Sequence, residues 1–198
     1  MRLLIHFYGD LHQPLHNISY VDDDKFKKGD VGGNSFKIDL PGARDLHTLW
    51  DKCLKKCKEV KLPLNKQDFD LIDAYAKTLM KKYPRSTKWV KDRLEIVSVK
   101  KISLESIPLA IKYVYGGIKY NEAPTKKYMQ EGGELIDKQL LIGGYRLSDS
   151  LQTLFKDEEV LMPHIKESNL SEDEESEDSH DCQEERIHTD ILLSLIHI

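Results

Sequence analysis

The sequence predicts a mostly α-helical domain with one short β element. Apolar residues recur at intervals of three and four over several long segments, which is the spacing of an amphipathic helix. Asp45 and Asn65 stand directly before two of these segments and can cap them. Pro14, Pro63 and Pro84 follow three of them, where helices are expected to end.

The first expected helix begins near Leu3 and ends before Pro14, and two potential metal ligands lie on it. His6 and Asp10 are four residues apart, so on a helix both side chains project from one face and can reach the same metal ion. His16 lies beyond the proline, so we expect it to approach from a turn and to serve a neighbouring ion. Imidazole and carboxylate groups form a ligand set that suits zinc.

A polar stretch and a glycine pair follow this helix. Asn17–Val31 is rich in charged residues and is expected to be a surface loop. Gly32, Gly33 and Asn34 come next, and the glycines allow a close backbone approach to a metal or a substrate phosphate. An ordinary turn is the alternative interpretation. Apolar and polar residues then alternate over Ser35–Leu40, which predicts a short strand.

A second pair of potential ligands lies on the next helix. Asp45 can cap a helix that we expect over residues 46–61, before Pro63. His47 and Asp51 are again four residues apart, in its first two turns. A single histidine in an apolar helix is commonly a core residue with satisfied hydrogen bonds. Two such pairs and a further histidine favour a metal cluster instead.

The remainder of the body is expected to be helical as well. Asn65 can cap an amphipathic helix that extends to about Tyr83. Two further helices are expected over Lys88–Val99 and Ser103–Tyr115, the second interrupted near Pro108. The last one spans Glu134–Phe155. Residues 1–155 would thus form one helical domain, whose length suffices to bury a core.

The charge of the chain is unevenly distributed. The net charge is -4, but residues 1–156 carry 28 basic and 20 acidic side chains, whereas the rest carries 2 basic and 14 acidic ones. A basic body favours a polyanionic substrate, although a solvated lysine-rich surface is the commoner cause of such an excess. No apolar run is long enough to cross a bilayer and no signal peptide is recognisable at Met1, so no membrane partner is expected.

Beyond the body, residues 156–189 form an acidic, serine-rich segment that contains few aromatic residues and is expected to be a disordered tail. Residues 190–198 turn apolar without continuing any upstream pattern. We interpret this end as non-native and exclude it from reasoning about the fold.

Three blocks of the sequence together resemble one known family. The segment His6–His16, the Gly32-Gly33-Asn34 triplet and the segment Asp45–Asp51 are similar in order and spacing to the signature of the S1/P1 nucleases. These are zinc-dependent, single-strand-specific enzymes of the phospholipase C/nuclease superfamily. Weaker similarity continues through Leu104-Glu105-Ser106 and Gly144–Leu147, so the resemblance covers about residues 1–155.

The resemblance implies a helical hydrolase with three clustered zinc ions that cleaves single-stranded DNA and RNA to 5′-nucleotides, often with 3′-nucleotidase activity. By position, His6 and Asp10 would ligate the first zinc, and Asp10 would bridge to the third and act as the catalytic carboxylate. His16, His47 and Asp51 would hold the second zinc.

Other residues of the signature carry further expectations. Gly33 and Asn34 are the expected substrate-binding residues. His12 matches the family pattern without being a ligand, so we expect it to support the site by packing.

The resemblance also implies that part of the domain is absent. In the family, the other ligands of the first and third zinc ions lie upstream of the signature. Residues 1–5 here read as the middle of an apolar helix without a preceding cap. We therefore expect the carboxyl-terminal part of a longer protein, whose missing amino-terminal half would be a partner. Only the second zinc site would have its complete ligand set, so this chain alone is expected to have weak or no activity.

Cysteines and glycosylation sequons give little independent information. Cys53 and Cys57 would share a face of the expected helix, whereas disulfides normally join separate elements. Asn17 and Asn169 begin sequons, a pattern frequent by chance. Family members are often disulfide-bonded secretory proteins, so the resemblance implies a glycoprotein in a secreted or secretory/lysosomal-type compartment.

Two alternatives remain open at this stage. A zinc phospholipase C shares the ligand types but hydrolyses a lipid phosphodiester. A non-catalytic helical binding protein, whose histidines are merely buried, belongs to a different class. The glycine pair with Asn34 and the basic body favour the nuclease.

Overall fold

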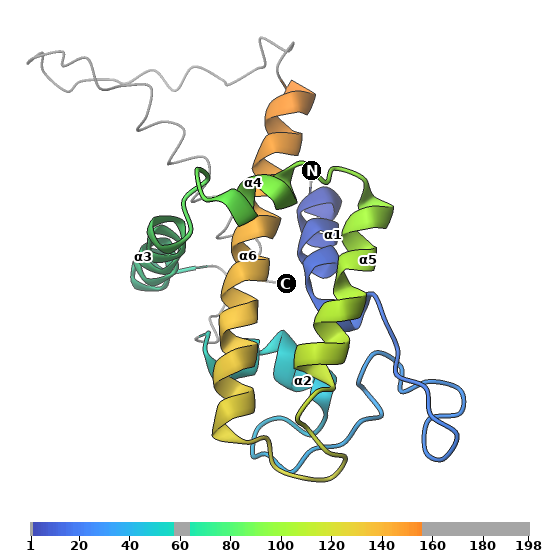
Figure 1. Cartoon of the computed structure of the whole chain (residues 1–198). Helices are drawn as coiled ribbons and strands as arrows, with labels where there is room; N and C mark the ends of the chain where they lie inside the picture. The colour runs from blue at the N-terminus through green and yellow to red at the C-terminus, as the bar shows by residue number, and fades with distance from the viewer. Residues whose placement is uncertain (1, 58–63, 156–198) are drawn as a thin grey trace, which may run out of the picture.

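The computed structural model describes residues 2–57 and 64–155, and this part of the chain is mostly helical, with a long irregular segment over residues 17–45 (Figure 1). The predicted tail over residues 156–189 and the apolar end over 190–198 lie outside the described residues. The helical elements are α1 (Arg2–His12), η1 (Pro14–His16), α2 (Leu46–Asp51), η2 (Cys53–Lys55), α3 (Lys66–Lys82), α4 (Lys88–Leu94), α5 (Val99–Leu109), η3 (Ala110–Val114) and α6 (Lys126–Phe155). The mostly α fold class is confirmed.

The long helix α6 is the central element of the fold. It contacts α1, α3, α4, η2 and η3, and Figure 1 shows α1 and α5 on one side of it and α3 on the other. Its Leu141, Ile142 and Tyr145 pack with Leu79 of α3 and Val90 of α4 in one buried cluster. In the part of the chain that the structure describes, no helix combines the length and apolarity that spanning a bilayer requires.

A second buried cluster holds α2 against the amino-terminal end of α6. Trp50 is only 2% exposed, and its indole Nε1 donates to the Tyr128 hydroxyl at 2.9 Å. That hydroxyl in turn donates to the carbonyl of Val114 at 2.7 Å. Leu46 and Leu49 are fully buried in the same cluster. Burial of one face of α2 therefore sets the direction in which its other face projects.

Helix α2 is shorter than predicted, because it ends at Asp51 rather than near residue 61. After Lys52, the three residues Cys53, Leu54 and Lys55 have φ angles of 49°, 52° and 63°, a left-handed conformation that non-glycine residues rarely adopt. This turn places Leu54, which is 4% exposed, into the core against Gly132 of α6. Burial of this leucine compensates part of the backbone strain. The predicted stop at Pro63 lies outside the described residues.

The short β element is a single bridge rather than a strand. Within this segment only Lys37 forms a β-bridge, with Asp45. The described residues contain no strand, so Ser35–Leu40 has no partner strand to pair with. The alternation arises because Phe36 and Ile38 are buried in an irregular segment. Alternating burial alone does not make a strand where no neighbour is available for pairing.

Three other helix boundaries differ from the prediction. Helix α4 ends at Leu94, before the expected end at Val99. Helix α5 already begins at Val99 and continues into the wider π-turn of η3, directly after Pro108, whose missing N–H interrupts the regular bonding pattern. Helix α6 begins at Lys126, where the Thr125 side chain accepts a hydrogen bond from a first-turn N–H.

The contact of Gly132 with the left-handed turn gives a testable consequence. A Cβ at Gly132 would lie 2.9 Å from Leu54 Cδ1, whereas at Gly133 the nearest atom, Lys56 Cδ, would be 3.6 Å away. Alanine gains about 1 kcal/mol of helix propensity at either position, but overpacking costs about 1–3 kcal/mol. We expect Gly132→Ala to be less stable than Gly133→Ala by about 1–3 kcal/mol in urea unfolding. Equal stabilities would contradict this packing.

Candidate metal centre

Helix α1 presents His6 and Asp10 on its outer face, as the four-residue spacing predicts. Leu4 and Tyr8 of the same helix pack against Leu147 of α6, so the face that carries His6 and Asp10 points away from α6. His6 Nε2 lies 3.2 Å from Asp10 Oδ2, and the side chain of His6 is 52% exposed. The pair is therefore accessible from solvent.

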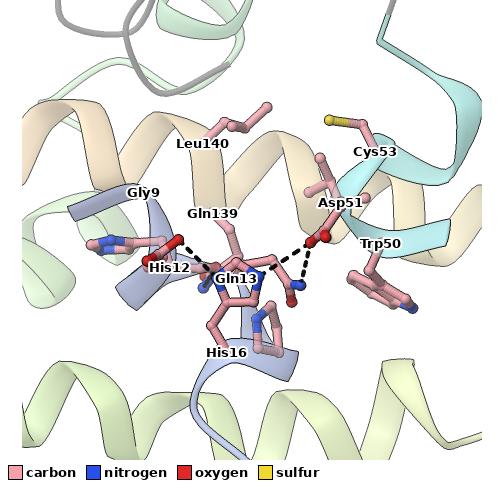
Figure 2. A pocket seen from close by; sticks show the side chains of 12 residues that line it. Gly9, His12, Gln13, His16, Trp50, Asp51, Cys53, Gln139 and Leu140 are labelled. Atoms are coloured by element: carbon pink, nitrogen blue, oxygen red, sulfur yellow. Dashed lines mark hydrogen bonds and ion pairs between the residues drawn. The ribbon is translucent and has the colours of Figure 1, made fainter. Parts of the chain in front are cut away.

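The short helix η1 brings His16 between two carboxylates (Figure 2). Its Nδ1 lies 2.9 Å from Asp10 Oδ1, and its Nε2 lies 3.2 Å from Asp51 Oδ1. Gln13 caps η1, because its Oε1 accepts from the N–H of Leu15 at 2.6 Å. Its Nε2 also donates to Asp51 at 2.9 Å. One glutamine thus fixes both the turn that carries His16 and the carboxylate opposite it.

Helix α2 supplies the second predicted pair. Asp45 caps the helix as expected, accepting from the N–H of Thr48 at 2.8 Å. His47 Nε2 and Asp51 Oδ2 are 3.1 Å apart, one turn along the helix. His47 Nδ1 lies 2.7 Å from the carbonyl of Gly32 and must donate its proton there. In the neutral ring this bond leaves Nε2 without a proton, which is the form in which imidazole binds a metal.

The glycine pair supports His47. Gly32 has a φ of +59°, and a Cβ there would lie 2.5 Å from the carbonyl oxygen of Leu15, so only glycine fits without a shift. The carbonyl of Gly33 accepts from the N–H of His47 at 3.3 Å. Asn34 is exposed, and its side-chain amide donates to the carbonyl of Val31 in its own turn, at 2.9 Å. Substrate binding by Gly33 and Asn34 stays a prediction.

Three of the predicted ligands converge on one point. One potential ligand atom from each of His16, His47 and Asp51 lies within 4.8 Å of the others, and the two imidazole rings stack with centroids 5.1 Å apart. Two imidazoles and one carboxylate are a protein ligand set of catalytic zinc, which leaves a coordination position for water or substrate. His6 and Asp10 adjoin this group through His16 but lie outside it.

The electrostatics of this group favour a positive charge within it. The pKa of His16 is raised, chiefly because Asp51 accepts a hydrogen bond from it. Burial opposes ionisation of Asp51, but hydrogen bonds from His16 and Gln13 outweigh this and lower its pKa. A metal ion bound between these ligands would replace a proton, since only a neutral imidazole can coordinate.

A hollow of about 80 Å³, open to solvent on one side, adjoins the group between α1, α2 and α6. Figure 2 shows His16 and Asp51 on one side of it, with Gln139 and Leu140 of α6 behind. Trp50 and Cys53 of the α2 region also line it. The hollow therefore places apolar surface beside the carboxylates, with space for a substrate group.

A buried network behind the hollow holds α1 against the rest of the fold. Arg146 of α6 donates to Glu105 at 3.0 and 3.1 Å, to His12 Nε2 at 2.9 Å and to the carbonyl of Arg93 at 2.7 Å. His12 Nδ1 lies 2.7 Å from the carbonyl of Tyr8, to which it donates. This arrangement agrees with the packing role expected for His12. Elements α1, α4, α5 and α6 are joined by a single guanidinium.

Sequence reasoning missed Gln13 and the partners of Arg146. No spacing rule singles out Gln13; its place directly before Pro14, where a helix cap is needed, is the one signal that the sequence carries. Arg146 and Glu105 lie on separate helices, so their contact is not a local feature of the sequence. Both sets of contacts nevertheless orient the helix and turn that present the candidate ligands.

The buried His12 makes stability depend on pH. Burial lowers its pKa from 6.5 to about 4, so the folded chain holds it neutral while the unfolded chain takes up a proton below pH 6.5. Its contribution is fully present above pH 6.5 and is lost as the pH falls toward 4, by about 3 kcal/mol in total. The matched variant His12→Gln keeps an acceptor for Arg146 that does not titrate. We expect its unfolding free energy, measured in chelator, to fall less across this window than that of the unchanged chain; parallel curves would contradict the assignment.

Comparisons with known proteins agree with this geometry. The family model described as S1/P1 Nuclease matches residues 1–156. Endonuclease 1 of Arabidopsis thaliana is 29% identical over 168 residues, covering 80% of this chain and 50% of the relative. Endonuclease 2 of the same plant is 26% identical over 152 residues, covering 76% of this chain and 49% of the relative. Nuclease P1 of Penicillium citrinum is 40% identical over 52 residues, covering 26% and 16%.

No solved structure matches the chain. The chain spans about half the length of the Arabidopsis relatives that it matches. The family model nevertheless covers all the candidate ligands, from His6 to Asp51. The match over residues 1–156, together with the helical fold, shows that the chain belongs to the S1/P1 nuclease family.

Proposed function

We propose that this chain is the metal-binding part of a zinc-dependent nuclease that hydrolyses phosphodiester bonds of single-stranded DNA and RNA to 5′-nucleotides, with additional 3′-nucleotidase activity. The observation that carries the proposal is the convergence of His16, His47 and Asp51 within 4.8 Å. Membership in a nuclease family supports the reaction class, and the ligand types support zinc.

The residues divide into two groups with different tasks. His16, His47 and Asp51 would hold the second zinc, and the Gln13 amide and the Gly32 carbonyl orient Asp51 and His47 for this role. His6 and Asp10 would hold the first zinc, and Asp10 would be shared with the third. Bound zinc supplies a Lewis acid and lowers the pKa of a coordinated water. Asp10 is the catalytic carboxylate in this proposal because two of the zinc ions would share it.

The substrate would reach this cluster from the solvent side. His6 is 52% exposed on the outer face of α1, and an open hollow bordered by Asp10, His16 and Gly32 lies beside it. Gly33 and Asn34 follow this hollow along the chain and are the proposed substrate-binding residues. Their backbone and amide groups suit the phosphate and sugar of a nucleotide, and the basic body favours a polyanion.

The remaining ligands are proposed to come from an amino-terminal half of the same protein. Relatives twice as long as the matched region support this, as does the solvent exposure of His6. The 198-residue chain on its own would then have weak or no activity. By family resemblance we also propose a secreted or secretory/lysosomal-type compartment.

The deciding assay compares substrates on the complete protein with and without zinc. We expect zinc-dependent release of 5′-nucleotides from single-stranded DNA and RNA, and no cleavage of phosphatidylcholine vesicles. Lipid cleavage without nucleotide release would favour the phospholipase alternative, and failure to bind any metal would favour a non-catalytic binding protein. Robust nuclease activity of the 198-residue chain alone would contradict its proposed dependence on a second half.

A further inference from the structure

The outer face of α1 combines two of the candidate ligands with two large apolar side chains. Four residues at helix positions i, i+3, i+4 and i+7 form one stripe that points away from α6: Leu3, His6, Phe7 and Asp10. Leu3 is 69% exposed and Phe7 is 58% exposed. Single exposed apolar residues are common, but these two lie beside both proposed ligands of the first zinc.

Helix α5, which lies beside α1 in Figure 1 and contacts it, is apolar on two opposite faces. Its inner face is buried through Ile102 and, at the start of η3, Ala110. Leu104, Ile107 and Ile111 lie on the other face at positions i, i+3 and i+7, and their exposed fractions range from 43% to 69%. A helix with apolar stripes on opposite faces is normally packed on both of them, because each stripe has to be removed from water.

We propose that the outer stripes of α1 and α5 are the surface against which the amino-terminal half of the same protein packs. The choice of this occupant rests on the proposed function, in which that half completes the first zinc site. Any segment that brings ligands to His6 and Asp10 approaches the stripe that Leu3 and Phe7 share with them, so it also covers these two side chains. Because α1 and α5 are in contact, one layer of packed helices can cover both stripes.

The length of the relatives supports this occupant over a second copy of the chain. The Arabidopsis relatives are about twice as long as the region that they share with this chain, so they contain enough additional chain to cover two neighbouring helices. A symmetric pair of copies would bury the apolar residues too. It would, however, bring together two stripes that each carry the carboxylate of Asp10, and like charges that face each other oppose association.

Hydroxyl-radical footprinting measures the exposure of these side chains without any substitution. In the complete protein we expect Phe7 to be oxidised at least about tenfold more slowly than in urea, because packed side chains are shielded from solvent. Trypsin releases residues 102–112 as one peptide that contains the outward residues of α5, and we expect the same protection there. In the 198-residue chain alone, diluted until gel filtration shows a monomer, Phe7 should react within about threefold of its rate in urea.

Phe69 is the matched control within the same molecule. It is a phenylalanine on α3, on the other side of α6 in Figure 1, and it is 41% exposed, less than Phe7. In the 198-residue chain Phe69 should therefore react no faster than Phe7, and in the complete protein this order should reverse. The reversal compares two rings in one sample, so it does not depend on the radical dose.

Two results would overturn the proposal. One is oxidation of Phe7 or of peptide 102–112 in the complete protein at nearly the rate found in urea. The other is protection of Phe7 in the 198-residue chain alone, since a second copy or another part of the chain would then cover the stripe. The footprint needs no substrate turnover. Protection without nuclease activity would therefore count against the proposed function alone, and activity with an exposed Phe7 against this interface alone.

Discussion

We expect the 198-residue chain to bind about one zinc ion, and a His47→Ala/Asp51→Ala variant to bind none. The two substitutions remove two of the three ligand atoms that converge within 4.8 Å and leave His16 alone, which cannot hold the ion by itself. Metal content after gel filtration, measured by plasma mass spectrometry, gives the stoichiometry. Circular dichroism verifies that the variant still folds.

His6→Ala is the matched control for this experiment. Like the double variant, it removes a histidine that lies four residues before an aspartate on a helix. His6 and Asp10, however, lie outside the group of three converging ligands. The control should retain its zinc, with a loss of affinity of less than tenfold. Retention of zinc by the double variant, or no zinc in the unchanged chain, would show that the family signature survives here without a functional second site.

Arg146→Met should destabilise the chain by about 3 kcal/mol, since it removes several charged hydrogen bonds at once and leaves the buried carboxylate of Glu105 with Arg93, at 2.9 Å, as its remaining cation. The side chains of Arg146 and Glu105 are only 4% and 10% exposed, and the guanidinium also serves His12 Nε2 and the carbonyl of Arg93. All of these acceptors would lose a charged donor at once. The unfolding free energy in urea measures the effect, at pH 7.5 and in chelator.

Lys66→Met provides the comparison for this loss. It removes one cation from an exposed pair with Asp70, where about 0–1 kcal/mol is expected. Arg146→Met combined with Glu105→Leu should recover part of the stability, because it removes the buried carboxylate that has lost one of its two cations, and the partly exposed Arg93 can be solvated instead. If Arg146→Met cost no more than Lys66→Met, the network would not be what holds α1 in place.

Local signals predicted a helix start where a capping side chain precedes the helix. Asp45 and Asn65 each cap the helix that follows them, because a cap needs only the side chain and the next few N–H groups. The end of α2 at Asp51 was not predictable in the same way. It depends on Leu54 entering the core beside Gly132, a contact with a distant part of the chain. Likewise, the alternation of apolar and polar residues over Ser35–Leu40 indicated which side chains are buried. It did not indicate whether a partner strand exists.

The candidate site was predictable in its local parts. The four-residue spacing placed His6 beside Asp10 and His47 beside Asp51, because a helix converts that spacing into proximity. The approach of His16 to both carboxylates depends on the tertiary fold, and the family resemblance rather than helix geometry assigned it to the second group. That these residues bind zinc stays a prediction.

The position of His16 has a consequence for the protein without metal. Asp10 and Asp51 would repel each other if nothing lay between them, but His16 contacts both and has a raised pKa. Protonation of His16 is therefore favoured, and the protonated ring would hold the two carboxylates in place by pairing with both. Loading one divalent ion while releasing that proton changes the local charge by a single unit. The centre could thus bind and release a metal ion while Asp10 and Asp51 keep their positions.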